Sequence, residues 1–217
     1  MRPVVFLGPT LLRRQAEALL DAEYRPAIRR GDLATLPPGC PVLIVDGEFD
    51  QSFSVSPKEI LTVLDSGRPV LGASSMGALR AAELAPYGME GIGWVFDAYL
   101  SGRIEGDDEV AVAFSPVDNS PLTIPLVNVR YWLERSLQRG LLGAAAARRC
   151  WRLARSIFYA ERTQMRLESV LKNYLGGDWL SRLLEAEGGR IPDIKRQDAE
   201  LALRHMRALQ IPEEKKG

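Results

Sequence analysis

The sequence predicts an α/β protein: a doubly wound, mostly parallel, Rossmann-like sheet followed by a C-terminal all-helical region. Short apolar runs alternate with segments of helical spacing through the first part of the 217-residue chain. The run 41–45 is continuously aliphatic, as expected for a strand buried on both faces. From residue 128 onward the patterns are helical. We therefore expect an α/β core over residues 1–127 and, over residues 128–217, a helical region packed on that core.

The ends of the first elements follow from particular residues. Thr10 is the expected N-cap of the first helix. Pro26 marks its strand as an edge strand, because proline cannot donate to a sheet ladder. Pro57 in a first turn and Gly67 just past the end delimit the second helix. The predicted elements are strands over 3–7, 24–28 and 41–45 and helices over 11–20 and 57–66.

The stretch 71–84 predicts a strand, a tight turn and the start of a helix. Ser75 falls at the turn, with Ala73 two residues before it and Gly77 two residues after it. This spacing is close to the G-x-S-x-G nucleophile elbow, with alanine in place of the first glycine. In the alternative interpretation, Ser74 or Ser75 simply caps the helix that follows.

Several loops are expected to meet at one edge of this sheet, because ligand sites of doubly wound sheets lie outside the carboxyl ends of the strands. A hydroxyl group on a strand-to-helix turn suits acyl chemistry, since amides at the helix N-terminus can stabilise an oxyanion. The loops that we expect there are Gly8-Pro9-Thr10, Arg30-Gly31-Asp32, Asp46-Gly47 and Ser74-Ser75-Met76-Gly77.

By topology, Asp46 is the carboxylate best placed to steer a nucleophile or a water molecule at this edge, and Glu59 is the second. The single histidine, His205, falls in a C-terminal helical pattern, which argues against a Ser-His-Asp system. Ser75 would then use a carboxylate or Lys58 as its base, or would only bind the substrate while a water molecule attacks.

Beyond the central stretch, the sequence predicts a glycine-rich loop over 87–93 and a short helix over 94–100. The segments 110–114 and 122–127 are expected to form a β-hairpin that extends the sheet. The acidic run Asp107-Asp108-Glu109 is expected to be a solvated entry to this hairpin. A metal or acid/base cluster is the alternative, although adjacent residues on a strand point to opposite faces.

The C-terminal part predicts helices with glycine-containing gaps between them. The expected helices are 128–139, 144–174, 179–187 and 195–209. In the longest, arginines gather opposite the apolar face, namely Arg148, Arg152, Arg155, Arg162 and Arg166. Such a stripe is a solvated face or, in the second interpretation, a docking surface for an acidic protein or a nucleic acid.

Composition describes an ordinary globular chain, 46% hydrophobic and 26% charged, with no net charge. Residues 1–129 carry a net charge of −7 and residues 130–217 one of +7. The apolar runs are too short for a membrane span or a signal peptide, so we expect a cytoplasmic protein without a membrane partner. Cys40 and Cys150 lack metal-site spacing, and neither a P-loop nor a dinucleotide fingerprint occurs, so we expect no metal and no cofactor.

A series of short motifs runs through residues 4 to 130. The most specific are the blocks Ser75-Met76-Gly77-Ala78-Leu79-Arg80-Ala81 and Asp107-Asp108-Glu109-Val110. The others include Phe6-Leu7-Gly8-Pro9-Thr10-Leu11, Arg30-Gly31-Asp32, Asp46-Gly47-Glu48-Phe49, Lys58-Glu59-Ile60-Leu61 and Pro125-Leu126-Val127-Asn128-Val129-Arg130. With these motifs the chain resembles the TfuA-like proteins. It departs from them at Pro57, where the family often has a histidine.

The resemblance implies a role beside a YcaO-type enzyme in the ATP-dependent conversion of a peptide backbone amide to a thioamide, in ribosomally made modified peptides. It implies hydrolysis of a thiocarboxylated, ubiquitin-fold sulfur carrier, which releases sulfide for the YcaO partner. That partner in turn acts on the precursor peptide. The reaction breaks an acyl–sulfur bond, the class of chemistry for which the Ser75 turn is suited.

In the enzyme hypothesis, the catalytic residues are Ser75, Asp46 and Glu59. Glycines would shape a narrow groove for the carrier's tail, and an arginine would hold a carboxylate-like group, unless Arg80 only pairs with Glu83. The expected substrate-binding residues are Gly8, Thr10, Arg30, Gly47, Ser74, Met76, Gly77 and Arg80.

Two other hypotheses are a non-catalytic partner, which docks on the YcaO enzyme through the helical half and activates it, and a nucleic-acid binder. The divided charge and the lack of interleaved exposed aromatic residues argue against nucleic acid. A homo-oligomer is compatible with the sequence.

Overall fold

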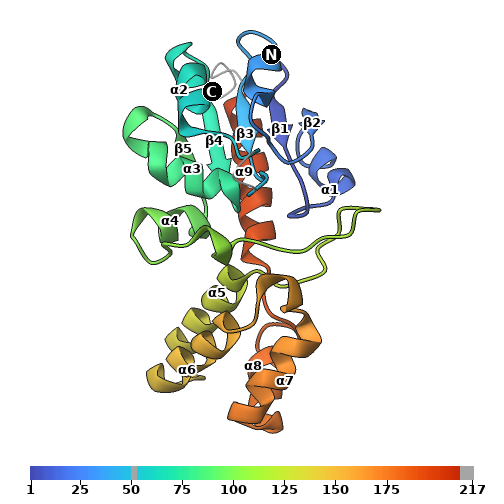
Figure 1. The fold of residues 1–217 in the computed structure, drawn as a ribbon, viewed down its shortest axis with the longest axis vertical. Helices are drawn as coiled ribbons and strands as arrows, with labels where there is room; N and C mark the ends of the chain where they lie inside the picture. Colours follow the sequence, from blue (N-terminus) through green and yellow to red (C-terminus); the bar gives the residue numbers. More distant parts are fainter. Residues whose placement is uncertain (50–52, 211–217) are drawn as a thin grey trace, which may run out of the picture. The chain divides into compact units, whose positions relative to one another are not determined.

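The protein contains a five-stranded, all-parallel sheet in a computed structural model that describes residues 1–49 and 53–210 (Figure 1). The strand order is β2-β1-β3-β4-β5. The strands are β1 (Val4–Phe6), β2 (Glu23–Arg25), β3 (Val42–Ile44), β4 (Val70–Ala73) and β5 (Glu90–Ile92). This confirms the predicted parallel α/β class and the edge position of β2. The same order defines flavodoxin-like sheets, whose winding reverses between β1 and β3.

Helices connect these strands and make up the C-terminal part of the chain. The α-helices are α1 (Arg13–Glu17), α2 (Pro57–Asp65), α3 (Met76–Leu84), α4 (Trp94–Leu100), α5 (Leu126–Gln138), α6 (Ala144–Arg155), α7 (Gln164–Leu175), α8 (Gly177–Glu185) and α9 (Ile194–Leu209). Short 3-10 turns are η1 (Asp32–Thr35), η2 (Ala85–Tyr87), η3 (Asp107–Glu109) and η4 (Tyr159–Glu161). Within the described ranges, no helix has both the length and the apolar character that crossing a bilayer requires.

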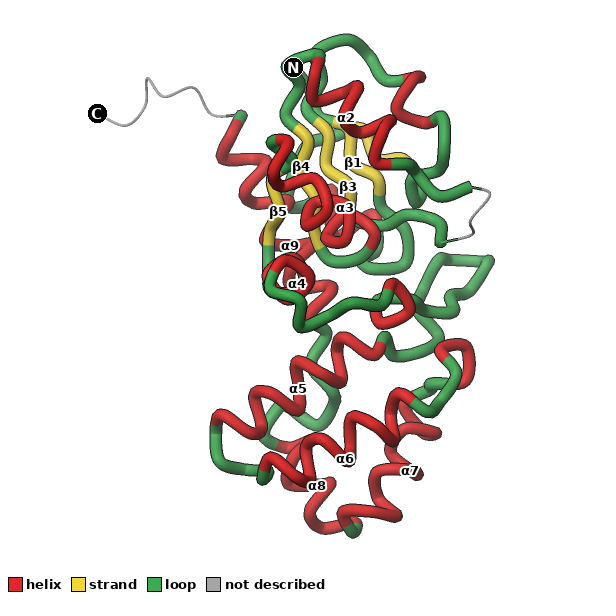
Figure 2. Tube along the Cα trace, turned by 60° about the vertical axis from the view of Figure 1, so that its left-hand side comes forward, coloured by secondary structure: helices red, strands yellow, loops and turns green. Residues whose placement is uncertain are grey.

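Both faces of the sheet are covered, α3 lying on one side and α9 on the other (Figure 2). Successive strand residues point to opposite faces, so Val4 and Phe6 belong to one apolar cluster and Val5 to the other. The first cluster includes Ile60 and Val63 of α2 and Ala81 and Leu84 of α3. The second includes Ala16 of α1 and Ala199, Ala202, Leu203 and Met206 of α9.

Contacts divide the chain into two compact units. The first unit comprises residues 1–107 together with α9 from Lys195, and the second comprises residues 108–194. This division differs from the boundary predicted at residue 127 for two reasons. The apolar face of α9 is part of the sheet's own core, and Ile124 packs in the apolar cluster of the C-terminal helices.

The glycine-rich loop predicted over 87–93 is partly wrong, because it contains the fifth strand. Gly91 in the middle of β5 has no side chain to mark the strand, and the ring of Phe96 fills the space beside it. A Cβ atom on Gly91 would lie 2.0 Å from Cδ2 of Phe96. The close packing of the Phe96 ring thus explains why a strand has a glycine here, at a residue that the sequence pattern assigned to a loop.

The predicted hairpin is only partly right: the chain turns back on itself, with hydrogen bonds from the Ser115 amide to the Ser120 carbonyl at 2.9 Å and from the Leu122 amide to the Ala113 carbonyl at 2.8 Å, but it does not extend the sheet. Within the described residues, one isolated antiparallel bridge joins Phe114 and Pro121, and neither segment adds to the sheet. The Ala113 amide donates to the Thr123 hydroxyl group at 2.8 Å, where a longer β-ladder would have a backbone carbonyl as the acceptor. The helix α5 already begins at Leu126, inside the predicted second strand.

The helix predicted over 144–174 is interrupted. The helix α6 ends at Arg155, and α7 begins after Thr163, whose hydroxyl group accepts a hydrogen bond from the Arg166 amide at 3.2 Å. The segment between them contains neither glycine nor proline, so the sequence carried no ordinary signal for the break.

One arginine of the predicted exposed stripe closes this break instead. Arg162 is 2% exposed. Its guanidinium group donates to the carbonyl oxygens of Ala154, Ile157 and Ile124 at 3.2, 2.9 and 3.4 Å. The guanidinium group thus joins the end of α6 to the segment before α5, and Arg162 belongs to the core of the helical unit.

Candidate functional site

The loops at the carboxyl ends of the strands come together, as the strand order requires. The amide of Gly8, after β1, donates to Asp46, after β3, at 2.9 Å. The amide of Gly77, at the start of α3, donates to the carbonyl of Val45 at 3.3 Å. A bridge between Ile28 and Gly47 adds the loop after β2. The site therefore lies where the winding of the sheet reverses, the usual place for a ligand in such folds.

Asp46 holds the loop after β1 in place. It is 3% exposed. Its Oδ2 atom accepts hydrogen bonds from the amides of Gly8 and Thr10, the latter at 3.1 Å, and its Oδ1 atom accepts one from the Thr10 hydroxyl group at 2.6 Å. Thr10 therefore does not cap α1, whose N-cap position is Leu12 without a side-chain hydrogen bond. The carboxylate ties together two of the expected site loops.

The turn between β4 and α3 is strained at Ser74. This residue has a φ of +69°, in a region that costs a non-glycine residue about 1–2 kcal/mol. Its side chain is fully buried, and its hydroxyl group has no hydrogen-bond partner among the described residues. Strained residues with unused polar groups cluster at functional sites, so Ser74 is the most unusual residue of this edge.

Ser75 occupies the N-cap position of α3, but its hydroxyl group forms no capping hydrogen bond. The alternative in which either serine caps this helix is therefore wrong. Ser75 is 2% exposed. In this conformation both hydroxyl groups are covered, and a substrate would reach them only if one of the neighbouring loops moved.

The glycines of the site serve close packing. A Cβ atom on Gly77 would lie 1.8 Å from the carbonyl oxygen of Ile44, and one on Gly72 would lie 2.1 Å from the carbonyl oxygen of Gly77. The side chain of Met76 fills the space next to Gly47, where a Cβ atom would lie 2.7 Å from its Cγ. These contacts replace the open groove that we expected the glycines to form.

Glu59 lies in a separate cluster at the start of α2. It forms a capping box with Ser56 and accepts a hydrogen bond from the Gly31 amide at 2.6 Å. Burial alone would raise the pKa of Glu59, but the hydrogen bonds from Ser56 and Gly31 and the charge of Arg30 lower its pKa below the ordinary value. Glu59 is thus an ionised structural carboxylate. Arg30 is exposed beside this cluster.

Arg80 is fastened to the protein on several sides. It pairs with Glu83 at 2.6 Å, as the alternative interpretation expected, and it donates to the Val55 carbonyl at 3.0 Å and to the Ser54 hydroxyl group at 3.3 Å. These contacts attach α3 to the segment before α2. Its hydrogen bonds leave less of the guanidinium group for a substrate.

The histidine lies apart from this edge, and the acidic run has partners of its own. His205 Nε2 is 2.8 Å from Oε1 of Glu90, the first residue of β5 and hence at the opposite, amino end of the sheet. In the acidic run, which forms the 3-10 turn η3 and not a strand entry, Glu109 is buried and pairs with Arg130 at 2.7 and 2.8 Å. Within the described ranges, no group of three or more metal-binding side chains occurs, and Cys40 and Cys150 are free and buried.

Asp198 is a buried carboxylate that the sequence analysis missed. It lies on α9, is 3% exposed, and accepts hydrogen bonds from the amides of Trp94 and Val95 at 3.0 and 2.7 Å. These amides begin α4, directly after β5. Burial raises the pKa of Asp198 to about 7, against the lowering effect of both hydrogen bonds. Its spacing of four from Ala202, on the apolar face of the helix, was the available signal.

Replacing Asp198 by asparagine is expected to flatten the pH dependence of stability. The folded protein retains the Asp198 proton up to about pH 7, whereas the unfolded chain releases it near 3.8. Stability should therefore fall as the pH rises through this window, by up to about 1.4 kcal/mol per pH unit. Urea unfolding across the window measures the slope. Gln197→Asn, at an exposed and uncharged position of the same helix, should keep the wild-type slope, and a slope unchanged in Asp198→Asn would contradict the assignment.

The fold and this edge define a flavodoxin-like α/β protein with a strained serine turn beside the point where the sheet winding reverses. The model of the TfuA-like protein family matches residues 46–163, more than half of the chain. The chain belongs to the TfuA-like family, whose members are associated with YcaO-type enzymes in thioamide formation. None of the curated proteins compared with the chain matches it.

Proposed function

We propose that this protein releases sulfide from a thiocarboxylated, ubiquitin-fold carrier protein and supplies it to a YcaO-type enzyme for backbone thioamidation of a ribosomal peptide. The observation that carries the proposal is the β4–α3 turn. It presents a strained serine, whose hydroxyl group is unused, at the carboxyl edge of the sheet. Membership of the TfuA-like family supports the association with YcaO chemistry.

The chemistry at this turn can be written in two steps. A serine hydroxyl group adds to the thiocarboxylate carbonyl, the C–S bond breaks, and the hydroxyl proton leaves with sulfur as HS⁻. Water then hydrolyses the serine ester, which gives the carrier carboxylate, a proton and free serine. In this proposal Ser74 or Ser75 is the nucleophile. Asp46 acts by fixing the loop after β1, which would border the carrier's tail.

The covered state of both serines sets a condition on the mechanism. With Ser74 fully buried and Ser75 at 2% exposure, the tail of the carrier has to displace a neighbouring loop before reaction. Such loop movement on substrate binding is common in enzymes.

A second candidate function is a non-catalytic partner that docks on the YcaO enzyme and activates it. It is favoured by the contacts of the expected catalytic groups, since Asp46, Glu59 and Arg80 are all bound to other parts of the protein. In this case the β4–α3 turn would serve only the fold.

Sulfide release from thiocarboxylated carrier, measured without the YcaO partner, tests the proposal. We expect wild-type protein to release sulfide. Ser74→Ala or Ser75→Ala, whichever removes the nucleophile, should reduce the rate at least about 100-fold. Ser66→Ala, at the end of α2, is a control that should keep the wild-type rate. Absence of release by folded wild-type protein, or full activity in both serine variants, would favour the docking function.

A further inference from the structure

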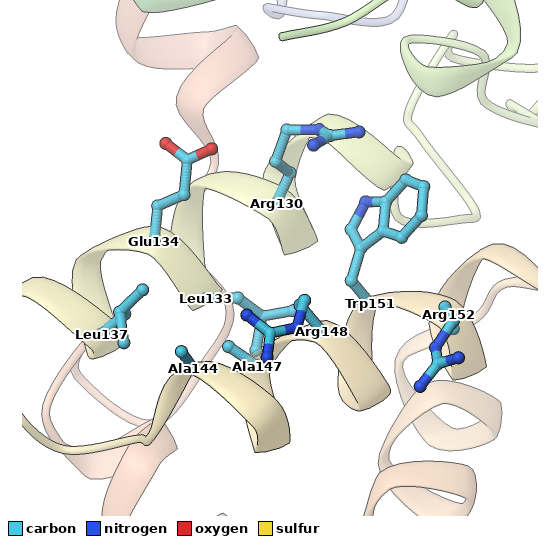
Figure 3. Close-up of a pocket in the computed structure, with 9 residues that line it drawn as sticks. All are labelled: Arg130, Leu133, Glu134, Leu137, Ala144, Ala147, Arg148, Trp151 and Arg152. Atoms are coloured by element: carbon cyan, nitrogen blue, oxygen red, sulfur yellow. The ribbon is translucent and has the colours of Figure 1, made fainter.

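A groove with a volume of about 510 Å³ lies between α5 and α6 in the helical unit (Figure 3). Its apolar part is formed by Leu133 and Leu137 of α5 and by Ala144 and Ala147 of α6. The two helices are consecutive in the chain and pack against each other. Neighbouring helices leave a trough of this kind, into which the apolar side of a third helix can pack.

The rim of this groove is unevenly charged, with exposed arginines on the α6 side and one acidic residue, Glu134, on the α5 side. The helix α6 contains four arginines and no acidic residue. Arg148 and Arg152 line the groove, are exposed, and form no ion pair with the described residues. Arg130, in contrast, is paired with buried Glu109. The free charge is thus concentrated on the α6 side.

Trp151 adds an unused hydrogen-bond donor. Its indole stands up from α6 beside Arg130 (Figure 3), and the guanidinium carbons of Arg130 and Arg155 lie 4.7 and 5.1 Å from the ring centroid. The Nε1 atom is buried and has no acceptor among the described residues. A buried N–H group without a partner is costly, so an acceptor brought by a bound segment would be favourable here.

We propose that the α5–α6 groove binds an acidic amphipathic helix of another protein. Aliphatic side chains of that helix would cover the exposed Leu137 and Ala144, and its carboxylates would pair with Arg148 and Arg152. A carboxylate or carbonyl oxygen would accept from Trp151 Nε1 after a rotation of the indole, because the atom is covered in the unbound protein. This assignment does not depend on the proposed sulfide release.

The lining favours a protein helix over a nucleic acid. Nucleic-acid sites without sequence preference combine basic residues with aromatic rings on which bases stack. Here the floor is aliphatic, and the aromatic side chain of the groove, Trp151, is already in contact with two guanidinium groups. Aliphatic floors suit the leucine-type anchors of an amphipathic helix.

The test uses a fluorescein-labelled synthetic peptide of about 18 residues, long enough to form helix in isolation. It carries leucine at positions i, i+3, i+4 and i+7 and glutamate beside them. We expect it to bind the full-length protein, as measured by fluorescence anisotropy. The double variant Arg148→Glu with Arg152→Glu should weaken binding at least about tenfold, because it reverses the rim charge. Trp151→Phe should weaken binding severalfold.

The matched control is the double variant Arg149→Glu with Arg166→Glu, which makes the same charge change at exposed arginines outside the groove. It should bind the peptide nearly as well as wild type. The proposal is overturned if the peptide does not bind, if both double variants weaken binding equally, or if a single-stranded DNA of similar charge competes it away. It is also overturned if sedimentation shows a dimer that the peptide dissociates, since a second copy would then occupy the groove.

Discussion

Replacing Gly77 by alanine is expected to lower the free energy of unfolding of the α/β unit by at least about 3 kcal/mol. The added Cβ atom would lie 1.8 Å from the carbonyl oxygen of Ile44 and 3.3 Å from the Cα atom of Gly72. Both neighbours are backbone atoms of central strands, so neither can rotate away as a side chain would. The start of α3 would have to move off the sheet. Thermal and urea unfolding followed by circular dichroism measure the loss.

Gly143→Ala is the control for this substitution. Gly143 precedes α6 with a φ of −77°, and nothing lies within 4 Å of a Cβ atom built on it. Alanine there should change stability by less than about 1 kcal/mol. If both variants lost the same free energy of unfolding, the close approach of α3 to β3 and β4 would not be the reason for a glycine at position 77.

Replacing Arg162 by methionine is expected to cost the helical unit about 3 kcal/mol. Methionine keeps the length of the apolar stem but leaves the carbonyl oxygens of Ala154, Ile157 and Ile124 without the donor that they share. Burial lowers the pKa of Arg162 below its ordinary value, with Asp108 and Glu109 opposing this effect. The three hydrogen bonds hold the guanidinium group in its buried position. The unfolding midpoint in urea reports their loss.

Arg166→Met provides the comparison, since Arg166 is exposed in the first turn of α7 and only its backbone amide is used, in the cap with Thr163. This substitution should lower the free energy of unfolding by no more than about 0.5 kcal/mol. A small effect at both arginines would contradict the role given to Arg162 at the break between α6 and α7.

The parallel sheet was predictable because its strands carry strong local signals. The run 41–45 is wholly aliphatic, and Pro57 and Gly67 bracket α2. The fifth strand was not predictable, because its central residue is a glycine, which the sequence pattern assigns to a loop. Gly91 is needed there because the ring of Phe96 fills the space beside it. The break before α7 was missed for a similar reason: a side chain from beyond the helix, Arg162, donates to the Ala154 carbonyl near its end. Long-range packing decided both.

The meeting of the loops at the carboxyl ends of the strands was predictable, and their local geometry was less so. The rule for doubly wound sheets correctly gathered Asp46 with the loop of Gly8. It could not show that Ser74 and not Ser75 has the left-handed backbone conformation, because both are serines in the same turn. It also missed Asp198, which reaches the amides of α4 from more than a hundred residues along the chain.

The return of α9 to the sheet affects the order in which the protein can form on the ribosome. Ala199, Ala202, Leu203 and Met206 complete the apolar cluster that contains Val5 and Leu71. During translation, strands β1 to β5 emerge before these residues do, and the part of the sheet that α9 covers stays exposed to water while residues 108–194 are made. Residues 108–194 can therefore fold before the sheet is fully covered, and an N-terminal fragment that stops before Lys195 would leave apolar residues of this cluster exposed to water.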